Sequence, residues 1–100
     1  MPEEFERELG RVSDRLRTLG PRWARRDLAA DAVPLAAVRA ALQQLADLAA
    51  DGRGEGRRAV PELAPHALAD QVVVLAGEAS AAGRSAAARD VLVGLRHALP

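Results

Sequence analysis

The sequence predicts an all-α fold, a compact bundle of four main helices plus a short helical segment after Pro21. Apolar residues recur at spacings of three and four along most of the 100-residue chain, which is the period of an amphipathic helix. Alanine, the residue with the highest helix propensity, supplies 23 positions. No segment shows the apolar–polar alternation of a strand bounded by turns. We therefore expect a single helical domain over residues 1–100.

The first predicted helix covers residues 3–19. Glutamates gather at its start and arginines near its end, which suits the helix dipole, and its apolar stripe is Phe5, Leu9, Val12, Leu16 and Leu19. Gly20 and Pro21 then favour a helix stop followed by a new turn, so we expect a short second segment over residues 21–30. Trp23 lies four residues beyond Leu19 and would continue the stripe if the helix kinks instead of ending.

Three further helices are predicted over residues 32–50, 61–82 and 85–99. Asp31 is a suitable N-cap for the first of them, and Pro34 is tolerated in its first turn. Residues 51–58 read Asp-Gly-Arg-Gly-Glu-Gly-Arg-Arg, so we expect a flexible loop over residues 51–60. Gly83 marks the end of the third long helix, and Ser85 is the expected cap of the last.

The composition and the N-terminal residues indicate the type of genome that encodes the protein and its location in the cell. The chain has no lysine, asparagine, isoleucine, tyrosine or cysteine and has 14 arginines, which indicates a bacterial genome of high GC content. The N-terminus is acidic where a secretory signal would be basic. No apolar run approaches the roughly 20 residues of a membrane span. We therefore expect a soluble, cytoplasmic protein.

Residues suited to catalysis are scarce. Without cysteine there is no disulfide, no zinc–thiolate site and no thiol nucleophile. The four hydroxyl side chains show no nucleophile–base spacing, and the two histidines lack further ligands at metal-binding spacing. We expect no enzymatic activity, no metal and no cofactor.

The most unusual feature is a basic stretch without an acidic residue, here called the arginine patch: Arg15, Arg17, Arg22, Trp23, Arg25 and Arg26. Arginine can bind phosphate or carboxylate, and tryptophan can stack on a base or anchor a protein contact. Alternatively, Trp23 continues the core stripe and the arginines form an ordinary solvated surface. The chain is neutral overall, so the patch suits an acidic protein partner better than nucleic acid.

Three consecutive valines, at positions 72–74, favour self-association. Consecutive residues of a helix are about 100° apart, so three in a row cover some 200° of its surface. Such a helix is either central in the bundle or shared with a second subunit. Val73 and Val74 are therefore the candidates for a homodimer contact.

Together these features predict a small non-enzymatic interaction or adaptor module. We expect a homodimer that binds a protein partner of unknown identity. Nucleic-acid or other polyanion binding through the arginine patch is the alternative. A bundle that binds a ligand between its helices is the third possibility.

Overall fold

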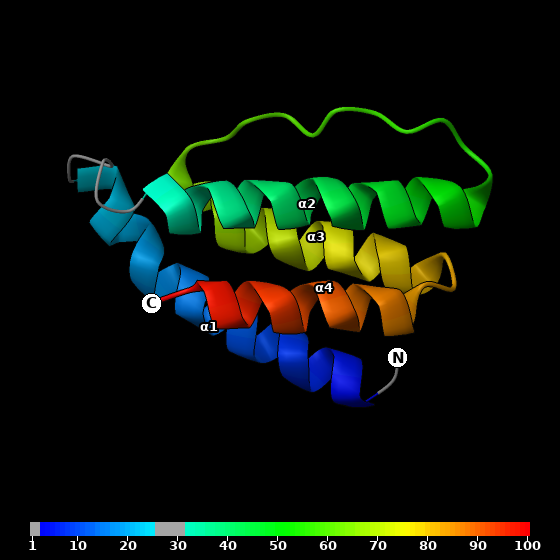
Figure 1. The fold of residues 1–100 in the computed structure, drawn as a ribbon, viewed down its shortest axis with the longest axis horizontal. Coiled ribbons are helices and arrows are strands. Elements are labelled where there is room, and N and C mark those ends of the chain that lie inside the picture. Colours follow the sequence, from blue (N-terminus) through cyan, green and yellow to red (C-terminus); the bar gives the residue numbers. More distant parts are fainter. Residues whose placement is uncertain (1–2, 26–31) are drawn as a thin grey trace.

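The computed structural model describes residues 3–25 and 32–100, and it forms them into four helices with a long connection between the second and third (Figure 1). The helices are α1 (Glu3–Arg25), α2 (Ala32–Arg53), α3 (Leu68–Ala81), which follows the 3-10 turn η2 (Pro65–Ala67), and α4 (Ser85–Ala98). These described ranges contain no strand, so the all-α prediction is confirmed. The radius of gyration is 13.0 Å, the size that about 100 residues of a compact domain should have.

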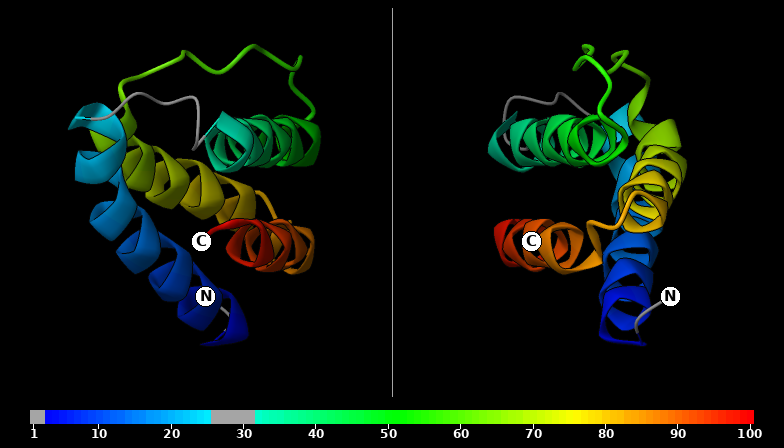
Figure 2. Two further views of the ribbon diagram at one scale, coloured as in Figure 1. Left: turned by 60° about the vertical axis from the view of Figure 1, so that its left-hand side comes forward. Right: turned by 90° about the vertical axis from the view of Figure 1, so that its right-hand side faces the viewer.

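The helices pack in two layers. Seen end-on, α2 and α4 lie on one side of the molecule, and α3 and α1 lie on the other (Figure 2, right). Helix α3 contacts both α2 and α4 of the opposite layer, and α1 contacts α4. Leucines, valines and alanines from all four helices fill the space between the layers, with Trp23 and Phe5 as the largest buried side chains.

No helix in the described part of the chain is long and apolar enough to cross a membrane.

The predicted break at Gly20-Pro21 is wrong. Helix α1 continues through both residues to Arg25, so residues 21–25 are its last turn and not a separate segment, while residues 26–30 of that segment lie outside the described ranges. The apolar stripe explains the continuity, because Leu19 and Trp23 are both buried on the same face. Gly20 has a packing role instead: a Cβ on it would lie 3.1 Å from the carbonyl oxygen of Pro65 in η2.

The connection between α2 and α3 also differs from the expected loop over residues 51–60. Helix α2 runs three residues further than predicted, to Arg53, and the long helix expected from residue 61 begins only at Pro65 as a 3-10 turn. The residue before a proline is driven out of the helical region, and Ala64 is accordingly extended, with φ −61° and ψ 152°. Residues 54–64, here called the strap, therefore cross the molecule as extended chain above α2 (Figure 1).

The turn between α3 and α4 follows the predicted glycine stop. Gly83 has a φ of +82°, a left-handed conformation that favours glycine, and the N–H of Arg84 donates to the carbonyl of Ala79. The expected cap at Ser85 is wrong, because Ser85 is the first residue of α4 and makes no capping hydrogen bond. Its hydroxyl lies 2.6 Å from the hydroxyl of Ser80 and so joins the two helix ends.

Candidate interaction surface

An apolar groove lies between the strap and α3. Its volume is about 320 Å³, and its walls are Val60, Leu63, Ala67, Asp70, Gln71, Val74 and Leu75. Val74 is 56% exposed and Leu63 is 42% exposed, although both are large aliphatic residues. Two exposed aliphatic side chains from different elements thus meet at one hollow.

The charge around this apolar groove is sparse. Asp70 is the only charged residue among its walls, and it lies in the first turn of α3, where a carboxylate suits the helix dipole. Helix α3 carries one further acid, Glu78, and no basic residue. The groove therefore presents a mainly apolar surface with a single negative charge at its wall.

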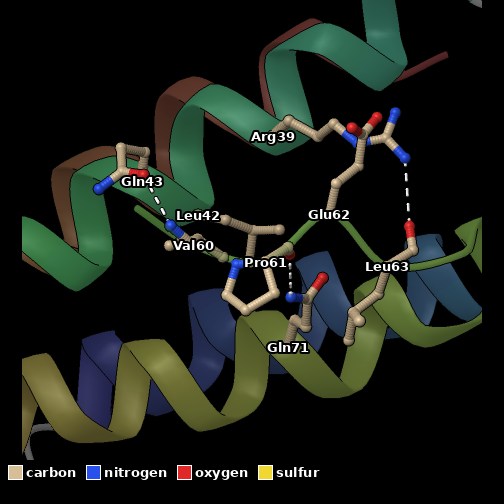
Figure 3. A pocket seen from close by; sticks show the side chains of 8 residues that line it. All are labelled: Arg39, Leu42, Gln43, Val60, Pro61, Glu62, Leu63 and Gln71. Carbon is tan, nitrogen blue, oxygen red and sulfur yellow. Dashed lines mark hydrogen bonds and ion pairs between the residues drawn. The ribbon is translucent and has the colours of Figure 1, made fainter. Parts of the chain in front are cut away.

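A second, more polar hollow shares Val60, Leu63 and Gln71 with the apolar groove (Figure 3). Its volume is about 230 Å³, and its other walls include Arg39 and Glu62. Arg39 comes from α2 and Glu62 from the strap, and their charged atoms lie 3.3 Å apart. The polar groups of this hollow hold the strap in place.

Gln43 of α2 makes the central contacts to the strap. Its side-chain Nε2 donates to the carbonyl of Arg58 at 2.9 Å, and its Oε1 accepts from the backbone N–H of Val60 at 3.0 Å. The same Nε2 also donates to Asp47 one turn further along α2, at 2.9 Å. This last bond orients the amide, so its oxygen and nitrogen both face the strap backbone.

Two more side chains extend the contacts toward the end of the strap. Gln71 of α3 donates to the carbonyl of Pro61 at 3.1 Å, and Arg39 donates to the carbonyl of Leu63 at 3.1 Å (Figure 3). Gln71 reaches the strap from α3, and Arg39 reaches it from α2. The strap is consequently fixed to both α2 and α3.

Arg57 anchors the start of the strap to the end of α2. Its Nε and Nη2 donate to the two carboxylate oxygens of Asp51, at 3.0 and 2.7 Å. The hydrogen bonds from Arg57 hold the pKa of the Asp51 carboxyl below its usual range. The segment expected to be a flexible loop thus has polar contacts along its length.

The two valines predicted to drive self-association differ in environment. Val73 is half-buried and does not line the apolar groove, whereas Val74 is exposed within it. The sequence pattern pointed to Val74 through its position in α3, but it gave no sign that Leu63 lies beside it. The signal for Leu63 is the pair of prolines at positions 61 and 65, which keep this part of the chain extended.

The only aromatic residue of the arginine patch lies in the core and not at the surface. Trp23 is 1% exposed and belongs to the main apolar cluster, as the alternative interpretation of the stripe expected. Its indole therefore offers no surface on which a base could stack. Binding to nucleic acid would depend on the arginines alone.

The arginines of the patch are spread over α1 and are partly engaged within the chain. Arg15 donates to the carbonyl of Pro100 at 2.6 Å, and Arg17 lies 3.6 Å from the carboxylate of Asp14. Arg22 is half-buried. Arg25 is the last residue of α1, and Arg26 lies outside the described residues. Whether these arginines bind a partner stays a prediction.

Within the described residues, no group of three or more histidine, cysteine, aspartate or glutamate side chains could hold a metal ion. Comparison with known proteins adds no functional information, because no family model, curated protein or solved structure matches this chain.

Proposed function

We propose that this chain is a non-enzymatic interaction module that associates with a second copy of itself through the apolar groove. The observation that carries the proposal is the exposure of Leu63 and Val74 at a single hollow. Exposed aliphatic residues that gather in this way are typical of protein-binding surfaces. Scattered single residues would not carry the same weight.

A second copy suits this surface for two reasons. The surface is mainly apolar, as the centres of homodimer interfaces are, and a twofold arrangement would place the exposed aliphatic residues of each copy against those of the other. A stable interface covers about 800 Å² on each partner. The apolar groove would therefore form its centre, and the neighbouring surfaces of α3 and the strap would form its edge.

A single introduced thiol tests the proposal, because the natural chain has no cysteine. We expect maleimide to react with Val74→Cys more slowly as the protein concentration rises, since a second copy covers this position. Val33→Cys is the matched control, because Val33 is 81% exposed and does not line the apolar groove. Its rate should not depend on protein concentration. Equal behaviour of the two thiols at all concentrations would contradict the proposal.

A further inference from the structure

The strap resembles a bound peptide more than an ordinary loop. Its backbone is extended, and the amide of Gln43 binds the carbonyl of Arg58 and the N–H of Val60 together. A glutamine amide that binds a donor and an acceptor of the same segment recognises its backbone and not its side chains. Such contacts do not require a particular residue at either strap position.

Side chains of both helices continue this recognition of the backbone. The carbonyl of Pro61 is bound by Gln71 and the carbonyl of Leu63 by Arg39. Figure 3 shows these side chains on either side of the strap. Pro61 has no N–H, so this residue leaves no backbone donor that would need a partner.

The side chains of the strap supply the specificity that backbone contacts lack. Val60 packs against the main core, whereas Leu63 is 42% exposed and forms part of the walls of both hollows. Glu62 pairs with Arg39. Main-chain hydrogen bonds combined with a packed side chain, here Val60, are features of extended-peptide recognition.

We propose that the surface between α2 and α3 is a binding groove for an extended peptide, and that the strap is its intramolecular occupant. The partner it fits is a protein segment in which an aliphatic residue, a proline, an acidic residue and a second aliphatic residue follow one another, as at positions 60–63. This proposal rests on the contacts of Gln43, Gln71 and Arg39. It does not depend on self-association through Val74.

The strap is covalently joined to the helices that bind it, and this connection keeps it bound. A segment joined to its own binding site acts at an effective concentration of the order of millimolar. A free peptide of the same sequence must therefore compete with the strap and should bind the natural chain poorly. Weakening the strap within the full-length chain should open the groove to the free peptide.

The test uses the full chain with residues 58–63 replaced by a glycine–serine segment of equal length. A fluorescein-labelled peptide of residues 57–64 is titrated with this variant and with the natural chain, and its anisotropy is measured. We expect saturable binding to the variant and much weaker binding to the natural chain. A peptide in which both aliphatic residues are replaced by aspartate should not bind.

Two glutamines that are adjacent in α2 provide the control for the site. Adding Gln43→Ala to the variant should weaken binding of the peptide about tenfold, because two hydrogen bonds are lost. Gln44 is exposed and does not line either hollow beside the strap, so adding Gln44→Ala should leave the affinity unchanged. Equal affinities for these two variants would overturn the assignment of the groove.

Circular dichroism shows whether the replacement keeps the natural helix content. Absence of saturable binding to a variant with natural helicity would overturn the proposal. If the replacement lowers helicity, the same titration is made with Val60→Gly combined with Leu63→Gly, which keeps the strap backbone and removes its aliphatic side chains. Binding of the peptide to that variant supports the proposal, and its absence overturns it.

Discussion

Arg96 in the last turn of α4 binds the carboxylate of Glu8 on α1. Its Nε lies 3.0 Å from each carboxylate oxygen, and its Nη2 lies 2.8 Å from Oε1. Only 6% of the Glu8 side chain is exposed, so this acid is buried at the contact between α1 and α4. Arg11 adds a second positive charge at 3.7 Å. The pair joins α1 to α4 through two residues that are 88 positions apart in the sequence.

Removal of the arginine from this pair should destabilise the fold. Arg96→Met keeps most of the side-chain volume but leaves the buried carboxylate without its main partner. We expect the free energy of unfolding to fall by about 1–3 kcal/mol, the usual effect of an unsatisfied buried polar group. Arg7→Met is the control, because Arg7 lies 2.8 Å from Glu3, whose side chain is 85% exposed. Urea unfolding should show a change of about 0–1 kcal/mol for that surface pair.

The same carboxylate should make stability depend on pH. The hydrogen bond from Arg96 is the largest influence on the pKa of Glu8 and lowers it below the ordinary value of 4.5, although burial acts in the opposite direction. The unfolded chain therefore binds the proton more readily than the folded chain. The contribution of Glu8 is complete above about pH 4.5 and is lost as the pH falls through the lower folded pKa. Urea unfolding between pH 7 and pH 3 should show a weaker pH dependence for Glu8→Gln than for the natural chain.

Substitution of alanine for two helical glycines should change the free energy of unfolding in opposite directions. Gly52 lies so close to the turn after α3 that a Cβ on it would be 2.8 Å from the Cβ of Ala82. We expect Gly52→Ala to lower the free energy of unfolding by about 1–3 kcal/mol through overpacking. Gly10 is exposed in α1, and nothing lies within 4 Å of its Cβ position. Gly10→Ala should raise stability by about 0.5–1 kcal/mol because alanine favours the helix. A stabilising Gly52→Ala would contradict the close approach of α2 to this turn.

The single tryptophan reports directly on its own burial. Because Trp23 is 1% exposed, its fluorescence should be quenched far less by iodide in the folded chain than in urea. Trp23→Ala should lower the free energy of unfolding by about 3–5 kcal/mol, the usual effect of removing a large core side chain. Strong quenching of the folded chain would contradict the burial of Trp23. It would instead support a contact role for Trp23 in the arginine patch.

The helical fold follows from the sequence because each apolar stripe has the helical period. Position 20 is an exception to this local pattern. Glycine before proline is the ordinary signal for a helix stop, but here the glycine allows α1 to approach η2, a contact between residues 45 positions apart in the sequence. Such a packing role leaves no local pattern. Helix α2 runs to Arg53, three residues beyond its predicted end, whereas the late start of α3 follows from the local effect of Pro65 on Ala64.

The candidate surface was only partly predictable for a similar reason. The run of valines in α3 indicated an exposed apolar position, and Val74 is one. The sequence predicts a helix at Leu63, whereas the side chains of α2 and α3 hold it in an extended strap. The interaction of Gln43 with Val60 joins positions 17 apart, and neither residue type indicates that contact. The strap and the apolar groove beside it therefore required the three-dimensional structure.

Sedimentation of the natural chain and two glutamate variants tests the central claim most directly. We expect the natural chain to form a concentration-dependent dimer, Val33→Glu to keep it, and Val74→Glu to remain monomeric with natural helicity. Both substitutions place the same charge on an exposed valine, but only Val74 lines the apolar groove. A natural chain that stays monomeric at all concentrations, or a Val74→Glu variant that dimerises like Val33→Glu, would contradict self-association through the groove.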